Sequence, residues 1–270
     1  MLNEDSVYEI AFHSTKQNLI RWEDNLSNRE QTFNHFDVLF PNARQIHSIV
    51  QSGLTSFGSN WEKLAYDLAS ANGYKTFEKN DFNKNVPVIS EDLKEFQQKM
   101  RRKFETEDVT LDKAIDEIRK FIIQNKLSST ERKKVESGKG IDFWFEKDGV
   151  ELIGDIKSPQ ENIGNGKKLA EHILIWATYR LMDEPMTEIE AVIAFPYNPY
   201  ADFETYMSLQ GQKFAPMKTG TDYLIADQFW EKLSGVANST KIIFDAFEAL
   251  SQSEQILRIK QTIADLSQAK

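Results

Sequence analysis

The chain has 270 residues, 40% of them hydrophobic and 28% charged, which is the composition of a soluble globular protein with room for a sizeable core. It contains no cysteine, so disulfides and thiolate zinc sites are excluded. Its net charge of −9 is opposite to the basic footprint of an ordinary nucleic-acid-binding protein, so a DNA partner would require a locally basic groove.

The N-terminal residues do not have the pattern of a targeting segment, because they are acidic and polar instead of basic and then apolar. Nowhere does an apolar run approach the roughly 18 residues that a membrane helix needs. We therefore expect a cytoplasmic protein with no membrane partner.

The first part of the chain is predicted to be helical. Residues 5–26 and 42–53 have helical patterning, with a break at Phe40-Pro41 because proline cannot continue a helix. They carry no motif of their own, so we expect residues 1–56 to form a helical N-terminal region with a structural role.

A third helix is predicted to begin at Ser59, because Ser59 and Glu62 have the spacing of a capping box. On this interpretation Glu62 is a capping or an exposed side chain. Residues 74–77 follow as a strand. The apolar stripe of the helix and the glycine that closes it are Trp61, Leu64, Ala65, Leu68 and Gly73.

Residues 78–138 are predicted to be a helical insertion. Two amphipathic helices, over 91–105 and 111–126, follow Ser90 and Thr110 as N-cap residues. Basic residues gather in two clusters, consisting of Lys99, Arg101, Arg102 and Lys103 and of Arg132, Lys133, Lys134 and Lys139. Each cluster alone is typical of a solvated face, but two clusters that flank the next motif favour a DNA partner.

Residues 139–160 predict a β-hairpin. Asp148-Gly149 is a strong turn signal, because both central positions of a type I′ turn require a positive φ, which glycine accepts freely and aspartate tolerates. Counting outward from this turn places Asp142 directly opposite Asp155. Side chains in such a pair have Cβ atoms roughly 4.5–5.5 Å apart, and like charges there are destabilising.

Alternation assigns the side chains of this hairpin to two faces. One is an ordinary core face of Phe143, Phe145, Val150, Leu152 and Ile156. The other carries Asp142, Trp144, Glu146, Glu151, Ile153, Asp155 and Lys157. Its two opposed carboxylates require a cation, and Mg²⁺ is the obvious candidate because it prefers oxygen ligands. The Lys157 ammonium would point into the same space, where it could orient or deprotonate a water or stabilise charge on a phosphate.

This pattern, Asp142, a twelve-residue spacer and then Asp155-Ile156-Lys157, resembles the catalytic signature of the PD-(D/E)XK nuclease superfamily. It departs from that signature in having isoleucine where a proline would precede the first aspartate. The resemblance implies an α/β fold, with a PD-(D/E)XK restriction-endonuclease-like core over residues 57–200 in which a central mixed β-sheet is flanked by helices.

The same resemblance implies the metal site. Mg²⁺, for which Mn²⁺ would substitute, would be held by Asp142, Asp155, the Ile156 carbonyl and Glu62. Glu62 is included because a glutamate on the first helix of such cores often contacts the metal or a water. The catalytic residues would be Asp142, Asp155, Lys157 and Glu62.

A polar loop over 158–166 is predicted after the hairpin, followed by a helix over 167–182 and an apolar strand over 189–195. Small hydroxyl and amide side chains in this loop could contact DNA, although a plain connecting loop uses the same residue types. These loop side chains are Ser158, Asn162 and Asn165.

Residues 201–270 are predicted to be a C-terminal region that packs as helices and is a candidate for DNA recognition. Helical structure is expected from residue 221 onwards. The candidate DNA-binding cations are Arg101, Arg102, Lys139 and Lys213.

The segments 52–65, 155–180 and 221–235 look like the TdeIII family of type II restriction endonucleases, with a resemblance that covers about residues 42–235. This resemblance implies Mg²⁺-dependent cleavage of double-stranded DNA at a short palindrome, with GGNCC the target associated with the family. A palindrome implies a two-fold homodimer, because protein symmetry mirrors site symmetry. A companion DNA methyltransferase is expected in the same system, although not as a stable complex.

Two other functions fit the same residues. A repair nuclease or junction resolvase of the same superfamily would cut DNA by its structure instead of its sequence. A non-catalytic DNA-binding or scaffold protein would cut no DNA, and it leaves the opposed aspartates without a purpose.

Overall fold

The structure of the protein, a computed structural model, describes residues 2–27, 43–160 and 163–268. A five-stranded sheet in the order β1-β4-β5-β6-β7 forms its centre. The strands are β1 Lys75–Thr76, β4 Phe143–Lys147, β5 Val150–Ile156, β6 Glu188–Phe195 and β7 Tyr223–Ile225. β1, β4 and β5 pair antiparallel, whereas β5, β6 and β7 run parallel. The predicted α/β fold, with a central mixed sheet flanked by helices, is therefore confirmed.

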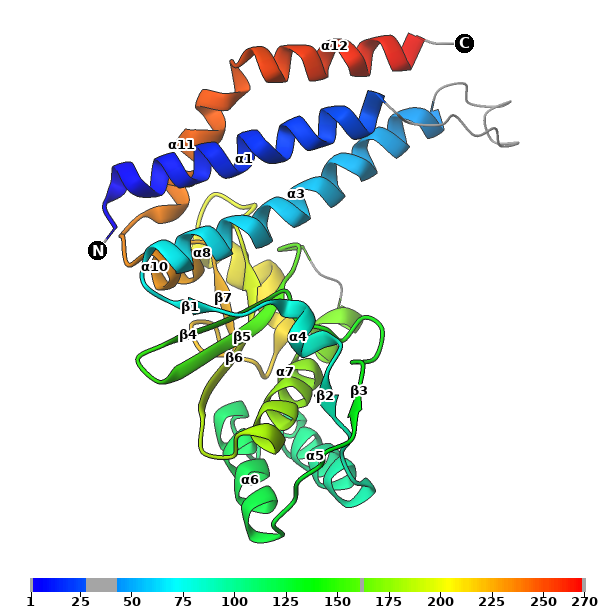
Figure 1. Cartoon of the computed structure of the whole chain (residues 1–270), viewed down its shortest axis with the longest axis vertical. Helices are drawn as coiled ribbons and strands as arrows, with labels where there is room; N and C mark the ends of the chain where they lie inside the picture. Colours follow the sequence, from blue (N-terminus) through cyan, green and yellow to red (C-terminus); the bar gives the residue numbers. More distant parts are fainter. Residues whose placement is uncertain (1, 28–42, 161–162, 269–270) are drawn as a thin grey trace.

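Helices surround this sheet, and a short two-stranded ladder lies apart from it (Figure 1). The helices are α1 Glu4–Ser27, α3 Ala43–Ala71, α4 Lys79–Asn83, α5 Glu91–Glu105, α6 Leu111–Gln124, α7 Ile163–Asp183, α8 Phe203–Tyr206, η1 Met207–Gly211, α9 Gln212–Phe214, α10 Asp227–Ser234, α11 Ser239–Ser251 and α12 Glu254–Gln268. The ladder pairs β2 Val86–Pro87 with β3 Arg132–Lys133. None of the described helices is both long and apolar enough to cross a membrane.

Both faces of the central sheet are buried. On one face Phe143, Phe145 and Leu152 pack against α3, α1, α10 and α11. On the other face Ile153 and Trp144 pack against α7 and the helices of the 78–138 segment. The prediction of a single core face on the hairpin is thus incomplete, because α7 covers the face that carries Asp155 as well.

The predicted hairpin turn is confirmed, and so is the register from Lys147 to Phe143, but the predicted pairing of Asp142 with Asp155 is wrong. Asp148 and Gly149 have φ values of 54° and 82°, and the ladder runs from Lys147 opposite Val150 to Phe143 opposite Gly154. The ladder ends there, one residue before the expected pair of aspartates. The Asp142 amide donates to the Gly154 carbonyl at 2.8 Å, so Asp142 lies beside the strand end and is not a ladder partner of Asp155.

The close approach of β5 and β6 depends on Gly154. A Cβ atom at this position would lie 2.1 Å from the Val192 carbonyl oxygen and 2.6 Å from the Phe143 ring. Only glycine fits where the next strand comes this near. The residue next to Asp155 therefore fixes how closely the β4–β5 hairpin packs against β6.

The predicted capping box at Ser59 is wrong, because α3 runs without interruption from Ala43 to Ala71. The Ser59 hydroxyl lies 3.5 Å from the Thr55 carbonyl, one turn back within the same helix. Packing against α1 overrides the local start signal: the Trp22 indole of α1 donates to Ser52 at 3.1 Å and lies against Gly53. The predicted break at Phe40-Pro41 lies outside the described residues.

Helices α5 and α6 of the 78–138 segment pack against α7, the helix that covers this face of the sheet. Its two predicted helices are present as α5 and α6, and the Ser90 hydroxyl accepts from the Leu93 amide at 3.3 Å. Thr110 occupies the N-cap position of α6 without a side-chain cap bond. Leu93 and Ile118 are fully buried in the same core as Trp176 of α7. The segment therefore shares one core with α7 and the sheet, although α5 and α6 lie beyond the end of the sheet (Figure 1).

Two predicted boundaries in the second half differ from the structure. Residues 223–225, expected to be helical, form β7 in the central sheet, where Tyr223 is 1% exposed. These apolar residues pair in parallel with β6 and are buried there. This long-range pairing determines their conformation. The sheet thus extends past residue 200. Helix α7 begins at Ile163, inside the predicted 158–166 loop.

Candidate active site

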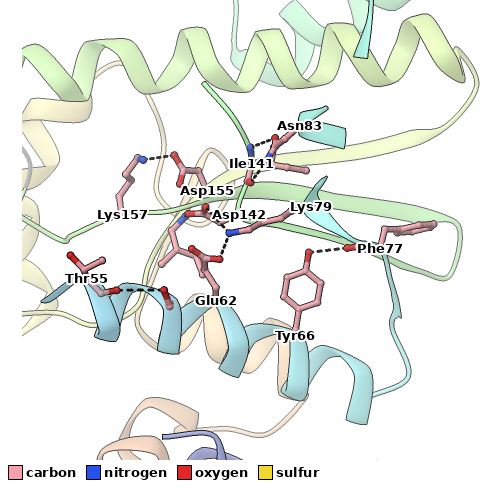
Figure 2. A network of polar contacts seen from close by, with 12 residues as sticks. Thr55, Glu62, Tyr66, Phe77, Lys79, Asn83, Ile141, Asp142, Asp155 and Lys157 are labelled. Carbon is pink, nitrogen blue, oxygen red and sulfur yellow. Dashed lines mark hydrogen bonds and ion pairs between the residues drawn. The ribbon is translucent and has the colours of Figure 1, made fainter. Parts of the chain in front are cut away.

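The open end of the β4–β5 hairpin gathers the residues that the sequence singles out for catalysis. Asp142 lies just before β4, Asp155 lies in β5, and Lys157 follows β5 directly. Glu62 approaches from α3 on one side of them (Figure 2). The fold therefore places together four residues that come from two distant parts of the chain.

Asp155 is the most buried of these groups, with 4% of its surface exposed. Burial, together with the hydrogen bond and charge of the neighbouring Asp142 carboxyl, raises the pKa of Asp155 to about 8. The Lys157 ammonium, 2.5 Å from Asp155 Oδ2, acts in the opposite direction. The Asp142 carboxyl is thus close enough to oppose the ionisation of Asp155, although the two residues are not a ladder pair.

Asp142 is held to the backbone of the neighbouring strand. Its Oδ2 accepts from the Ile156 amide at 3.0 Å, and its own amide donates to Gly154. Its Oδ1 lies 3.8 Å from the Lys79 ammonium. One carboxylate oxygen therefore fixes Asp142 to β5, while the other faces a cation.

The residue before Asp142 is fixed by Asn83, the last residue of α4. The Asn83 amide nitrogen donates to the Ile141 carbonyl at 2.9 Å, and its oxygen accepts from the Ile141 amide at 2.8 Å (Figure 2). A Cβ atom on Gly140 would lie 2.9 Å from the Asn83 oxygen. These two hydrogen bonds hold the backbone of Ile141, which lies beyond the last ladder pair of β4 at Phe143. We call this pair of bonds the Asn83 clamp; the sequence patterns did not identify it.

Glu62 lies on the face of α3 that passes the hairpin end. Burial and the Asp142 charge raise the pKa of Glu62, although the ion pair with Lys79 opposes the shift. Lys79, the first residue of α4, thereby contacts Glu62 and approaches Asp142. Lys79 is a site residue that the sequence patterns did not single out.

The donor set suits a hard divalent cation, because it consists of carboxylate and carbonyl oxygens. The Asp142 carboxyl opposes the ionisation of Asp155, and a cation between the two carboxyl groups would relieve that repulsion. Within the described residues no three acidic or histidine side chains already converge as a ligand set. The residues present therefore fit a metal ion at the Asp142–Asp155 pair. The Glu62 carboxylate is instead paired with the Lys79 ammonium.

The candidate DNA-binding residues lie at several places in the fold. Arg101 and Lys139 both pair with Glu171 of α7, and all three line a cavity of about 160 Å³. Arg102 and Ser158 are exposed. The Lys213 ammonium lies 2.8 Å from the Gln210 side-chain oxygen. Asn162 and the side chain of Asn165 lie outside the described residues.

A mixed sheet whose β4–β5 hairpin carries two aspartates and a lysine at its open end is consistent with a restriction-endonuclease-like core. The sequence profile of the family described as type II restriction endonuclease, HinfI, matches residues 3–251. The chain therefore belongs to the HinfI family of type II restriction endonucleases. This confirms the predicted class of protein, while the narrower TdeIII resemblance stays a prediction.

A curated relative supports the same class. The type II restriction enzyme MjaII of Methanocaldococcus jannaschii is 27% identical to this chain over 124 residues. The match covers 42% of this chain and 32% of that enzyme, so the chain spans about a third of the length of the relative it matches.

Proposed function

We propose that this protein is a type II restriction endonuclease that hydrolyses phosphodiester bonds of double-stranded DNA in a Mg²⁺-dependent, sequence-specific reaction. The observation that carries the proposal is the contact between the Asp142 and Asp155 carboxyl groups, with Lys157 paired to Asp155. The family match over most of the chain supports DNA as the substrate.

In this proposal the oxygens of Asp142 and Asp155, with the Ile156 carbonyl, hold Mg²⁺, for which Mn²⁺ substitutes. A cation bound there would polarise the scissile phosphate and offset the charge that develops on it. Asp142 keeps one oxygen on the Ile156 amide, so only its other oxygen is available to the ion. Glu62 completes the set by contacting the ion or a water.

Lys157 is proposed to position the attacking water. Its ammonium is held beside Asp155, and its amide donates to the Ala194 carbonyl of β6 at 2.9 Å, which fixes the direction from which its side chain leaves the backbone. The water oxygen would bond to phosphorus and lose a proton to solvent, and the bond from phosphorus to the 3′ oxygen would break. The 3′ oxygen takes up a proton, and a 5′ phosphate remains.

Single substitutions test these roles. Asp142→Ala, Asp155→Ala and Lys157→Ala should each reduce plasmid cleavage by at least about 10³-fold, since each removes a group that acts on the reacting phosphate. Circular dichroism and a DNA-binding assay without metal should remain close to wild type. Glu91→Gln, an exposed change on α5, is the control and should cleave normally. Full activity of Asp155→Ala would overturn the assignment.

DNA recognition is proposed to involve residues around this site and on α5. The candidates are Arg101, Arg102, Lys139, Ser158, Asn162, Asn165 and Lys213. Arg101 and Lys139 are paired with Glu171, so binding DNA through them requires an exchange of a carboxylate partner for a phosphate.

The recognition site proposed from the TdeIII resemblance is GGNCC. A palindromic site would be matched by a two-fold homodimer, with one hairpin end for each DNA strand. A companion DNA methyltransferase would protect host DNA, and the enzyme would act in the cytoplasm. Sequencing the ends of digested DNA and measuring the mass of the protein in solution test the site and the dimer.

A further inference from the structure

Lys79 occupies a distinctive place in the candidate active site. Its ammonium contacts Glu62 Oε2 and lies 3.8 Å from Asp142 Oδ1 (Figure 2). Glu62 and Asp142 are two of the three carboxylates proposed above to hold the metal ion. A protein cation therefore stands between two groups that a divalent cation would use.

The three side chains are partly withdrawn from water, with 35% of Lys79, 27% of Glu62 and 25% of Asp142 exposed. Charges in such surroundings interact more strongly than on an open surface, because less solvent screens them. The ammonium thus offsets the repulsion between the Glu62 and Asp142 carboxylates.

The position of Lys79 is built into the fold. It begins α4, and the other end of this helix is held by the Asn83 clamp on Ile141. The residue Phe82 between them is 4% exposed and belongs to the main core. Just before α4, the Phe77 carbonyl accepts from the Tyr66 hydroxyl of α3 at 2.8 Å. The backbone of Lys79 is thereby fixed to α3 and to the segment that carries Asp142.

We propose that Lys79 is an internal counter-ion that occupies the cation position between Glu62 and Asp142 in the metal-free protein and competes with the divalent ion for it. The proposal rests on the function proposed above. Metal binding breaks the contacts of Lys79 with both carboxylates, and the released ammonium becomes available for a phosphate oxygen of DNA. Lys79 therefore lowers the affinity for metal in the absence of DNA.

The test measures binding of Mn²⁺ alone to the full-length protein by isothermal titration calorimetry, without DNA. Lys79→Met should bind Mn²⁺ about tenfold more tightly than wild type, because a like charge next to the metal position has been removed. Lys79→Arg should stay within about twofold of wild type, because it retains the charge. The melting temperature of Lys79→Met without metal should fall, and Mn²⁺ should raise it by more than it raises that of wild type.

Equal Mn²⁺ binding by Lys79→Met would show that Lys79 does not compete with the metal ion. Weaker binding would show that Lys79 instead supports the ligand Glu62. Either result would overturn the proposal. Lys79→Gln provides a second variant if Lys79→Met does not fold. Asp155→Asn separates this inference from the proposed function. If wild type and Asp155→Asn both fail to bind Mn²⁺, the proposed metal site fails. If only Asp155→Asn fails, the metal site stands and the Lys79 variants decide the inference.

Discussion

Asp155 is the residue on which the proposed cation site depends most. It is almost fully buried, and the Asp142 carboxyl beside it adds to the burial in raising its pKa to about 8. Lys157 compensates only in part. The residue therefore favours the binding of a further cation.

Asn83 is predicted to be a positioning residue for Asp142. Asn83→Ala removes both hydrogen bonds to Ile141 and leaves its backbone without these partners, so we expect a loss of about 1–3 kcal/mol in the free energy of unfolding. Cleavage should fall by about tenfold or more through kcat, because Asp142 loses its orientation. Urea unfolding and steady-state cleavage measure the two effects.

Asn85→Ala is the matched control for this change. Asn85 lies two residues further on and is exposed, and its backbone amide, which the substitution keeps, bonds to Phe82. It should leave stability within about 0.5 kcal/mol and activity close to wild type. Equal effects of the two substitutions would contradict a specific role for Asn83.

Site residues that belong to one local sequence pattern could be predicted from the sequence. Site residues that come from a distant segment of the chain could not. Asp142, Asp155 and Lys157 are recognisable because the hairpin turn fixes their spacing. Lys79 and Asn83 reach the site from α4 across 63 and 59 positions of the chain relative to Asp142, and no periodicity connects them. Their roles depend on the packing of α4, which only the folded structure defines.

At the scale of elements, a buried ion pair joins the hairpin to α7. Arg180 donates to both oxygens of Glu151 at 2.6 and 2.7 Å, and the Trp144 indole donates to the same carboxylate at 2.9 Å. Burial alone would raise the pKa of Glu151, but the hydrogen bonds and charge of Arg180 outweigh it and lower the pKa. The pair fixes β5 against the helix that covers it.

Breaking this pair should destabilise the protein and change its response to acid. Glu151→Gln leaves Arg180 without a charged partner, so we expect a loss of about 3 kcal/mol in the free energy of unfolding at pH 7. The lowered pKa stabilises the folded state above the unfolded-state pKa of about 4.3, and this contribution is lost as the pH falls through the lower folded-state value. Wild type and variant should therefore converge below about pH 4 in urea unfolding.

Asp245→Asn is the control for this pH dependence. Asp245 pairs with Lys241 on the exposed side of α11, where solvent screens the interaction, so the substitution should change little at either pH. A difference between wild type and Glu151→Gln that is independent of pH would show that the carboxylate charge is not what joins the two elements.

Element boundaries are less predictable from sequence than the hairpin. The turn at Asp148-Gly149 has a local cause, and its register follows from it. Helix α3 contains a strong local start signal at Ser59 that packing against α1 overrides. Strand β7 is too short to show a period and forms because β6 offers an edge. Local rules are reliable where no distant partner competes.

At the scale of the whole molecule, a chain of net charge −9 is proposed to bind DNA. Some of its basic side chains are paired with acidic side chains of the same chain. The Glu171 carboxylate of α7 contacts both Arg101 of α5 and Lys139, which precedes the hairpin. These residues line one cavity beside α7. Glu171 thus limits how much positive charge this surface presents to a phosphate backbone.

Glu171→Gln is predicted to strengthen DNA binding because Arg101 and Lys139 each lose one carboxylate partner, while Glu105 and Glu136 remain beside them. We expect tighter binding of a non-specific duplex without metal, and a steeper loss of affinity as salt is raised, because more phosphate contacts displace more counterions. Fluorescence anisotropy over a series of salt concentrations measures both. Glu184→Gln makes the same change of charge at an exposed position and should have a much smaller effect. Indistinguishable salt slopes for the two variants would exclude this surface from DNA binding.

The most direct test of the central claim is digestion of a plasmid by the wild-type protein with Mg²⁺, followed by sequencing of the fragment ends. The account predicts discrete fragments whose ends share one short palindrome, no cleavage in EDTA, and no cleavage by Asp155→Asn with Mg²⁺. A smear of random ends, cleavage confined to branched DNA, or the same fragments from Asp155→Asn would contradict it.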